Sequence, residues 1–176
     1  MRCVVVGTSG SGKSTFAREL ASKARLHYVE LDKLYWAANW TPRHASEFQQ
    51  AVQRETECER WVVDGNYSAM REAFWPRATH VVWLNFSRTV VFSRIIRRTF
   101  KRAITQEELW DGNRESLRKA LLSKQSILLW SFTTYAKNRL KYARLRVSPE
   151  YAHLQWQELQ TPRQAKAFIR SHAGNA

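Results

Sequence analysis

Residues that form disulfides or metal sites are scarce in this chain. Its 176 residues include only Cys3 and Cys58, with no C-x-x-C pair, and its five histidines show no ligand spacing. The sequence therefore supports neither a disulfide framework nor a zinc site built from cysteine. Any metal is therefore expected to bind together with a ligand and not in a cluster of protein side chains.

Long apolar runs and flexible linkers are also missing. No stretch approaches the roughly 18 to 20 continuous apolar residues of a membrane span, and the first residues have a strand pattern unlike a signal peptide. The chain has no internal repeat, low-complexity tract or Gly/Pro-rich linker. We therefore expect one soluble domain over residues 1–176, in the cytoplasm and without a membrane partner.

Positive charge is abundant. Lysine and arginine number 29 against 15 acidic residues, for a net charge of +14. Residues 88–146 hold fifteen of the basic residues and four of the acidic ones. Such a concentration suits an anionic partner, either clustered phosphates on a small molecule or a nucleic acid backbone. A solvated basic helix face is the alternative for any single lysine in the run.

A phosphate-binding loop is the most specific motif present. Residues 7–14 read Gly-Thr-Ser-Gly-Ser-Gly-Lys-Ser and fit the Walker A pattern G-x-x-x-x-G-K-[ST]. The glycines let the backbone curl so that successive N–H groups face the β-phosphate. A predicted strand at 2–7 precedes the loop and a predicted helix at 13–23 follows it, which places the loop at a helix N-terminus. The context predicts a nucleoside triphosphate site.

Each part of this loop has an expected role. Lys13 is predicted to reach the β- and γ-phosphates, and the Ser14 hydroxyl is predicted to ligate Mg²⁺. The expected cofactors are therefore ATP and its own Mg²⁺. Nucleotide contacts are also expected from Gly7, Thr8, Ser9, Gly10, Ser11, Gly12 and Thr15.

Strand and helix patterns alternate along the rest of the chain. This alternation predicts a three-layer α/β fold, a P-loop NTPase with a five-stranded parallel sheet. The segment 103–150 breaks the alternation with two helical stretches, 107–124 and 125–145, and we interpret it as a helical lid insertion. The further strands are expected at 27–32, 61–65, 80–84 and 153–159, and the further helices near 44–58, 87–101 and 162–172.

Two acids follow apolar runs at predicted strand ends, where ligands gather in open α/β sheets. Asp64 is a candidate to hold Mg²⁺ through water or to orient a substrate. Asp32 is a candidate to accept a proton from an attacking hydroxyl or to bind the substrate. Capping of a turn or helix is the alternative for both, and Glu30 is interpreted as structural.

Arginines and aromatic residues supply further candidates. Arg94 and Arg98 are four residues apart, so they share a helix face and are candidates to bind ATP phosphates and stabilise the transferring phosphoryl group. A helix cap is the alternative for each. Arg71 and Arg114 are weaker candidates for substrate binding. The remaining substrate candidates are Tyr35 and Trp36, which lie beside Asp32 within an expected acceptor region at about 33–60.

These residues together resemble the nucleoside monophosphate kinase group of P-loop proteins, which includes adenylate, shikimate and gluconate kinases. The resemblance rests on the loop at 7–14, on Asp64 followed by Gly65, and on the pair Arg94 and Arg98. A narrower resemblance is to adenylate-kinase-like proteins labelled DNA topology modulation (FlaR-like), and it rests on residues 31–36, 63–67 and 112–116.

The resemblance implies a five-stranded parallel core, Mg-ATP binding and kinase activity on an unidentified acceptor. Two departures bear on the acceptor. Adenylate kinase follows its Asp-Gly with an aromatic residue, proline and arginine, whereas this chain has Asn-Tyr-Ser at 66–68. Shikimate kinase has Asp-x-Asp where residues 30–32 keep only the second acid. A different acceptor is therefore expected.

Two functions remain open from the sequence. The first is an ATP-dependent phosphotransferase acting on a small molecule. The second is a nucleic-acid-binding regulatory protein switched by nucleotide, which the basic segment and the narrower resemblance suggest. No helix-turn-helix, zinc finger or RNA-binding pattern supports the second function.

Overall fold

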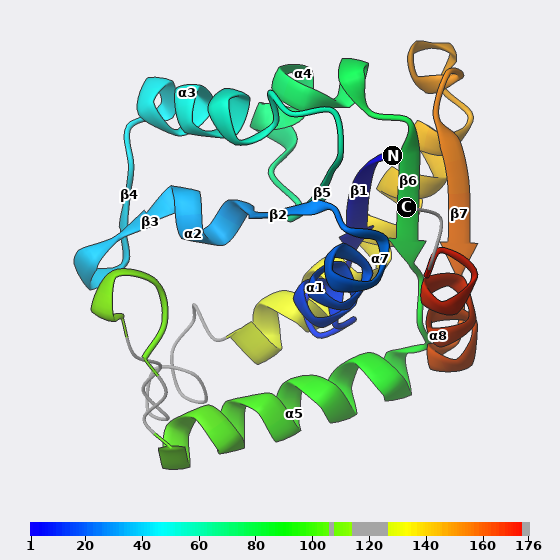
Figure 1. Cartoon of the computed structure of the whole chain (residues 1–176). Helices are drawn as coiled ribbons and strands as arrows, with labels where there is room; N and C mark the ends of the chain where they lie inside the picture. The colour runs from blue at the N-terminus through cyan, green and yellow to red at the C-terminus, as the bar shows by residue number, and fades with distance from the viewer. Residues whose placement is uncertain (106–107, 114–126, 174–176) are drawn as a thin grey trace.

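A five-stranded sheet forms the centre of the molecule in a computed structural model that describes residues 1–105, 108–113 and 127–173 (Figure 1). The strand order is β2-β5-β1-β6-β7, and every neighbouring pair is parallel. The expected parallel sheet is confirmed. Its strands are β1 (Arg2–Gly7), β2 (His27–Glu30), β5 (Trp61–Asp64), β6 (His80–Leu84) and β7 (Gln155–Leu159).

Helices cover both faces of this sheet, which explains why the central strands are apolar throughout. One core joins the sheet to α1 (Lys13–Ala24), α5 (Arg88–Thr105) and α8 (Pro162–Ser171). The other joins it to α3 (Ala45–Glu55) and α4 (Arg71–Phe74). Along β1, residues 3 and 5 enter the first core and residues 4 and 6 the second. The three-layer prediction is confirmed.

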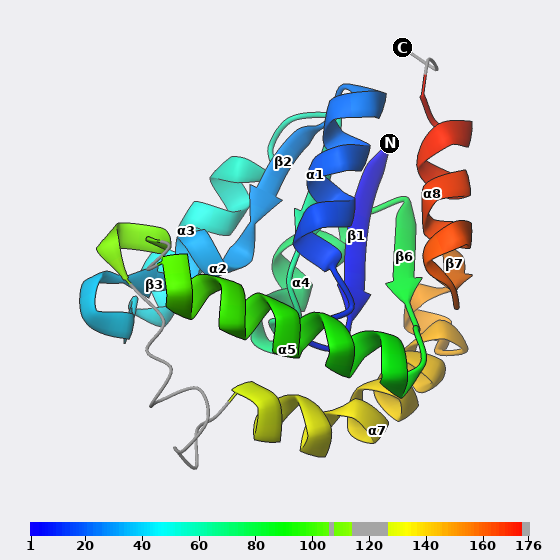
Figure 2. The same ribbon diagram turned by 90° about the horizontal axis from the view of Figure 1, so that it is seen from below.

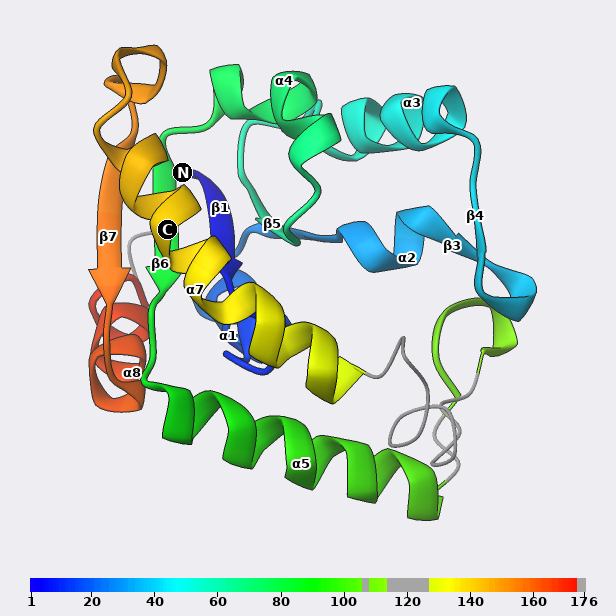
Figure 3. The same ribbon diagram turned by 180° about the vertical axis from the view of Figure 1, so that it is seen from behind.

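Helix α7 (Ile127–Arg146) belongs to both cores. Tyr135 is buried in the first core and Tyr142 in the second. Figures 2 and 3 show α7 passing the end of the sheet toward which β1 points. It therefore links the two helical layers at the carboxyl edge of the strands.

The region after β2 differs from the prediction. The expected strand at 27–32 ends at Glu30, opposite Asp64, the last residue of the neighbouring strand β5. Helix α2 (Leu31–Tyr35) follows, so Asp32 lies in a helix and not at the end of a strand. A small antiparallel hairpin then forms from β3 (Trp36–Ala37), a 3₁₀ turn (Ala38–Trp40) and β4 (Thr41–Pro42).

The expected insertion at 103–150 is described in part. Helix α5 extends to Thr105, a short turn occupies 108–113, and α7 matches the stretch expected at 125–145. Most of the helix expected at 107–124, together with the candidate Arg114, lies outside the described residues. In the ranges that are described, no helix has both the length and the apolar character needed to cross a membrane.

Candidate active site at the phosphate loop

The phosphate loop connects β1 to α1 at the carboxyl end of the central strand (Figure 2). Gly10 and Gly12 have φ values of 85° and 89°, a left-handed region that residues with a side chain rarely adopt. A side-chain carbon at Gly10 would overlap Ile95 of α5, and one at Gly12 would lie 2.9 Å from the Arg94 guanidinium. The glycines thus let the loop curl tightly against α5.

Arg94 holds the loop from the side of α5. Its Nη1 donates a hydrogen bond of 2.7 Å to the Ser11 carbonyl, and its guanidinium lies 5.1 Å from the ring centre of Phe86. Burial lowers the pKa of Arg94. Arg94 therefore contacts the loop backbone, and its predicted contact with phosphate stays a prediction.

The other loop residues divide by exposure. Thr8 and Ser11 are buried, and the Ser11 amide donates to the Thr8 carbonyl at 3.0 Å. Ser9 and Ser14 are half-buried, whereas Thr15 is exposed in the first turn of α1. Among the predicted contacts, Thr15 is thus the residue turned most toward solvent.

Charged side chains converge beside the loop. Burial lowers the pKa of Lys13, the carboxylates of Asp64 and Asp32 raise it, and the charge of Arg98 lowers it further. Asp64 is only 3% exposed. Burial raises the pKa of Asp64 to about 6, against the opposing effects of Lys13 and of a hydrogen bond with Ser14. These four charged groups therefore lie within electrostatic reach of one another.

Asp64 and Ser14 fit a magnesium ion. The Oδ1 atom of Asp64 is buried and has no hydrogen-bond partner among the described residues, and the Ser14 hydroxyl bonds to the same carboxyl group. A buried carboxylate oxygen left unpaired beside a hydroxyl is the kind of donor set that Mg²⁺ uses when phosphates and water complete its shell. No group of three His, Cys, Asp or Glu in the described part of the chain forms a separate metal cluster.

Asp32 is held by a residue that sequence reasoning did not select. The hydroxyl of Tyr67 donates a hydrogen bond of 2.6 Å to Asp32 Oδ1. Burial and the charge of Asp32 raise the pKa of Tyr67, so this tyrosine remains a donor. The Tyr67 ring packs 4.8 Å from Tyr35 and 5.1 Å from Phe48. The feature of the sequence that could have identified Tyr67 is its position directly after Asp64-Gly65-Asn66.

Two of the predicted substrate residues take part in packing. Tyr35 lies between the rings of Trp36, Phe48 and Tyr67, which supports α2 against α3. The Arg71 guanidinium lies over the rings of Trp75 and Tyr151, at 5.1 and 5.8 Å. Arg71 shares a small cavity with Asn66 and Lys141. Trp36 is half-buried on the hairpin.

The turn at 108–113 packs against the hairpin at 36–42, and we call this contact the clasp. Asn113 accepts a hydrogen bond from the Trp40 amide at 2.7 Å and donates to the Ala37 carbonyl at 2.9 Å. Arg43 pairs with Asp111 at 2.6 Å, and the rings of Trp40 and Trp110 meet at 6.2 Å. The clasp joins the segment after α5 to the expected acceptor region.

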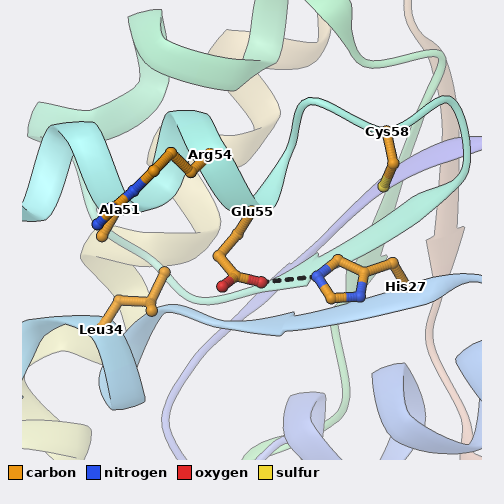
Figure 4. A pocket seen from close by; sticks show the side chains of 6 residues that line it. All are labelled: His27, Leu34, Ala51, Arg54, Glu55 and Cys58. Atoms are coloured by element: carbon orange, nitrogen blue, oxygen red, sulfur yellow. Dashed lines mark hydrogen bonds and ion pairs between the residues drawn. The ribbon is translucent and has the colours of Figure 1, made fainter.

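A cavity also lies elsewhere in the molecule. It measures about 660 Å³, is open to solvent and lies between β2 and α3, where His27 bonds to Glu55 at 2.7 Å (Figure 4). The cavity runs beside β2, the edge strand of the sheet, from His27 at the start of that strand to Leu34 in α2. Its lining residues are His27, Leu34, Ala51, Arg54, Glu55 and Cys58.

Comparison with known proteins identifies the fold class. A gluconokinase from Sinorhizobium meliloti 1021 superposes with a TM-score of 0.50 and 21% identity, over 99% of this chain and 94% of that one. A sugar kinase from Janibacter sp. HTCC2649 superposes with a TM-score of 0.51 and 14% identity, over 96% of this chain and 90% of that one. This chain therefore has a three-layer α/β fold of the P-loop kinase type.

No family model and no curated protein matches the sequence. The expected fold related to the nucleoside monophosphate kinases is confirmed at the level of architecture. The narrower resemblance to DNA topology modulation proteins stays a prediction.

Proposed function

We propose that this protein is a magnesium-dependent kinase that transfers the γ-phosphoryl group of ATP to a hydroxyl of a small-molecule acceptor. The observation that carries the proposal is the convergence of Lys13, Asp64 and Asp32 at the phosphate loop, with one buried oxygen of Asp64 left unpaired in the part of the chain that the structure describes. A triphosphate cradle, a metal ligand and a candidate base are the parts that phosphoryl transfer needs.

Each residue has a role in this reaction. The loop amides and Lys13 bind the β- and γ-phosphates, and Arg98 stabilises charge on the transferring group. Arg94 keeps the loop in shape through the Ser11 carbonyl. Asp32, oriented by Tyr67, positions the acceptor hydroxyl and takes its proton. Ser14 and Asp64 would hold Mg²⁺, which offsets the negative charge of the phosphate oxygens when bound.

For the acceptor we propose a sugar or a sugar acid. The names of the two structural neighbours, a gluconokinase and a sugar kinase, support this class. The half-buried Trp36 offers an aromatic face of the kind that sugar rings pack against. Within the region at about 33–60, Tyr35 supports Asp32 through Tyr67. Arg71 and Arg114 remain proposed contacts to the acceptor.

We also propose that residues 103–150 act as a lid. The clasp supports this role, because it connects the end of α5 to the hairpin of the acceptor region. Closure of such a segment would exclude water and limit hydrolysis of ATP. The concentration of lysine and arginine between 88 and 146 would bring positive charge to the phosphates.

A panel of acceptors tests the proposed function. The protein is incubated with ATP labelled at the γ-phosphate, Mg²⁺ and, in separate reactions, nucleosides, nucleotides, sugars, sugar acids and DNA ends. We expect label in a sugar or sugar acid, and none with the Lys13→Ala variant. Transfer to a nucleotide or DNA end would contradict the acceptor class, and salt-sensitive DNA binding without transfer would favour the regulatory alternative.

A further inference from the structure

Two buried tyrosines of α7 face the carboxyl edge of the sheet. Tyr135 and Tyr142 are 4% and 1% exposed and are seven residues apart, which places them on the same side of the helix. They reach the two loops that flank the phosphate loop. This arrangement follows from the sheet order, because β1 lies between β5 and β6.

On the β5 side, Tyr142 acts through Asn66. The Tyr142 hydroxyl donates to Asn66 Oδ1 at 2.8 Å. The Asn66 side-chain amide bonds to both backbone groups of Gly7: Nδ2 donates to the Gly7 carbonyl at 2.6 Å, and the Gly7 amide approaches Oδ1 at 3.4 Å. The backbone pairing of β1 with β5 stops at Val5 and Asp64. Beyond that point, the Asn66 side chain replaces the backbone of β5 as the hydrogen-bonding partner of β1, as far as the first residue of the loop.

On the β6 side, Tyr135 acts through Phe86. The Tyr135 hydroxyl donates to the Phe86 carbonyl at 2.8 Å. The Phe86 ring lies beneath the guanidinium of Arg94, which itself bonds to the Ser11 carbonyl. Tyr135 thus fixes the residue against which Arg94 packs. The contacts of Tyr142 therefore end at Gly7, the first residue of the loop, and those of Tyr135 end at Ser11, in the middle of the loop.

We propose that Tyr135 and Tyr142 are positioning residues that hold the phosphate loop in its nucleotide-binding shape from both flanks. The proposal rests on the proposed function only in that the loop binds ATP. A loop that must present several amides to one phosphate loses affinity when its ends move, because the contacts are then formed at the cost of ordering the backbone. Both side chains are buried, and each hydroxyl bonds to a group that belongs to a flanking loop.

Removal of each hydroxyl tests the proposal. The variants are Tyr142→Phe, Tyr135→Phe and the double variant, which keep the rings in the cores. The matched control is Tyr151→Phe, because Tyr151 is 3% exposed and its hydroxyl contacts Glu72 and not the loop. Two quantities are measured: the dissociation constant of a fluorescent ATP analogue with Mg²⁺, and the hydrogen exchange of the peptide covering residues 7–14.

We expect each α7 variant to weaken binding of the ATP analogue by about fivefold, the effect of one lost buried hydrogen bond, and the double variant by more. Exchange in residues 7–14 should accelerate in the same order without nucleotide. The control should change neither quantity. Equal binding and exchange in wild type and variants would overturn the proposal, as would an equal effect of the control. If the wild type binds no nucleotide, the proposed function fails, and the exchange measurement still decides for or against the positioning role.

Discussion

Asp32 is the residue on which the proposed chemistry depends most directly. It lies in the first turn of α2 and accepts a hydrogen bond from Tyr67. The negative charge of Asp32 raises the pKa of Lys13, so the two side chains interact. An acceptor hydroxyl bound beside Asp32 would therefore lie close to the expected position of the phosphates. In the proposed reaction, Asp32 aligns that hydroxyl and removes its proton.

Substitution of Asp32 by asparagine keeps the size of the side chain and removes its charge. We expect kcat to fall by about 100-fold or more, the usual contribution of a general base, with little change in ATP affinity. Tyr67→Phe removes only the orienting hydrogen bond and should lower kcat by about fivefold. Steady-state kinetics with the acceptor found in the panel measure both effects. Unchanged turnover in Asp32→Asn would remove Asp32 from the mechanism.

The two cysteines should react very differently with alkylating reagents. Burial raises the pKa of Cys3 to about 12, and its side chain is fully enclosed, whereas Cys58 is exposed. Since the thiolate is the reactive form, we expect about one modified thiol per folded chain and about two after unfolding in urea. Mass spectrometry of the Cys58→Ser variant provides the control. Modification of Cys3 in its folded state would contradict the placement of β1 in the core.

Secondary structure elements differ in how far the sequence could predict them. Strands β1, β5 and β6 are short apolar runs because helices cover them on both sides, and this pattern is visible locally. The hairpin at 36–42 has no such local pattern, because it is held by Asn113, more than seventy residues away in the chain. No local pattern encodes such a partner.

The same distinction applies to the candidate site. Lys13, Ser14 and Asp64 were predicted because a motif or a strand end marks each of them. Tyr67 and Asn66 were missed because their roles depend on tertiary contacts with Asp32 and Gly7. The backbone contact of Arg94 with Ser11 was also missed, since it arises because α5 packs directly against the loop, and its predicted contact with phosphate stays a prediction.

The edge strand β7 forms an ion pair with α7. Glu158 accepts hydrogen bonds from Asn85 at 2.7 Å and Gln160 at 3.1 Å, and it pairs with Arg146 at 3.0 Å. Burial alone would raise the pKa of Glu158, but these partners hold it below its usual value. Its stabilising effect is therefore present at neutral pH and is lost as the pH falls and the carboxylate becomes protonated.

Glu158→Gln should accordingly lower the free energy of unfolding by about 1 kcal/mol at about pH 7. The difference from wild type should shrink as the pH falls through the lowered pKa of the folded carboxyl group, because the wild-type side chain then becomes neutral as well. Urea denaturation over a series of decreasing pH values gives the comparison. A difference that persisted at low pH would indicate lost packing and not lost charge.

At the scale of the whole molecule, Mg-ATP should stabilise the folded chain. A ligand at 100 times its dissociation constant adds about 2.7 kcal/mol, which corresponds to a rise in Tm of about 5 to 10 °C for a domain of this size. We expect the rise only when Mg²⁺ and ATP are both present, and we expect Lys13→Ala to abolish it. Thermal denaturation followed by circular dichroism measures the shift. An equal rise in the variant would place the nucleotide elsewhere.

The clasp has a consequence for how the molecule folds. Asn39, Trp40 and Asp111 have φ values of 56°, 55° and 51°, a left-handed conformation that costs most non-glycine residues roughly 1 to 2 kcal/mol and costs asparagine and aspartate less. This cost is balanced only when Asn113 and Arg43 have made all their contacts, and these contacts join segments far apart in the chain. A half-formed clasp would carry the strain without the contacts. It should therefore form late and in a single cooperative step, with no stable intermediate in which the hairpin is only partly gripped.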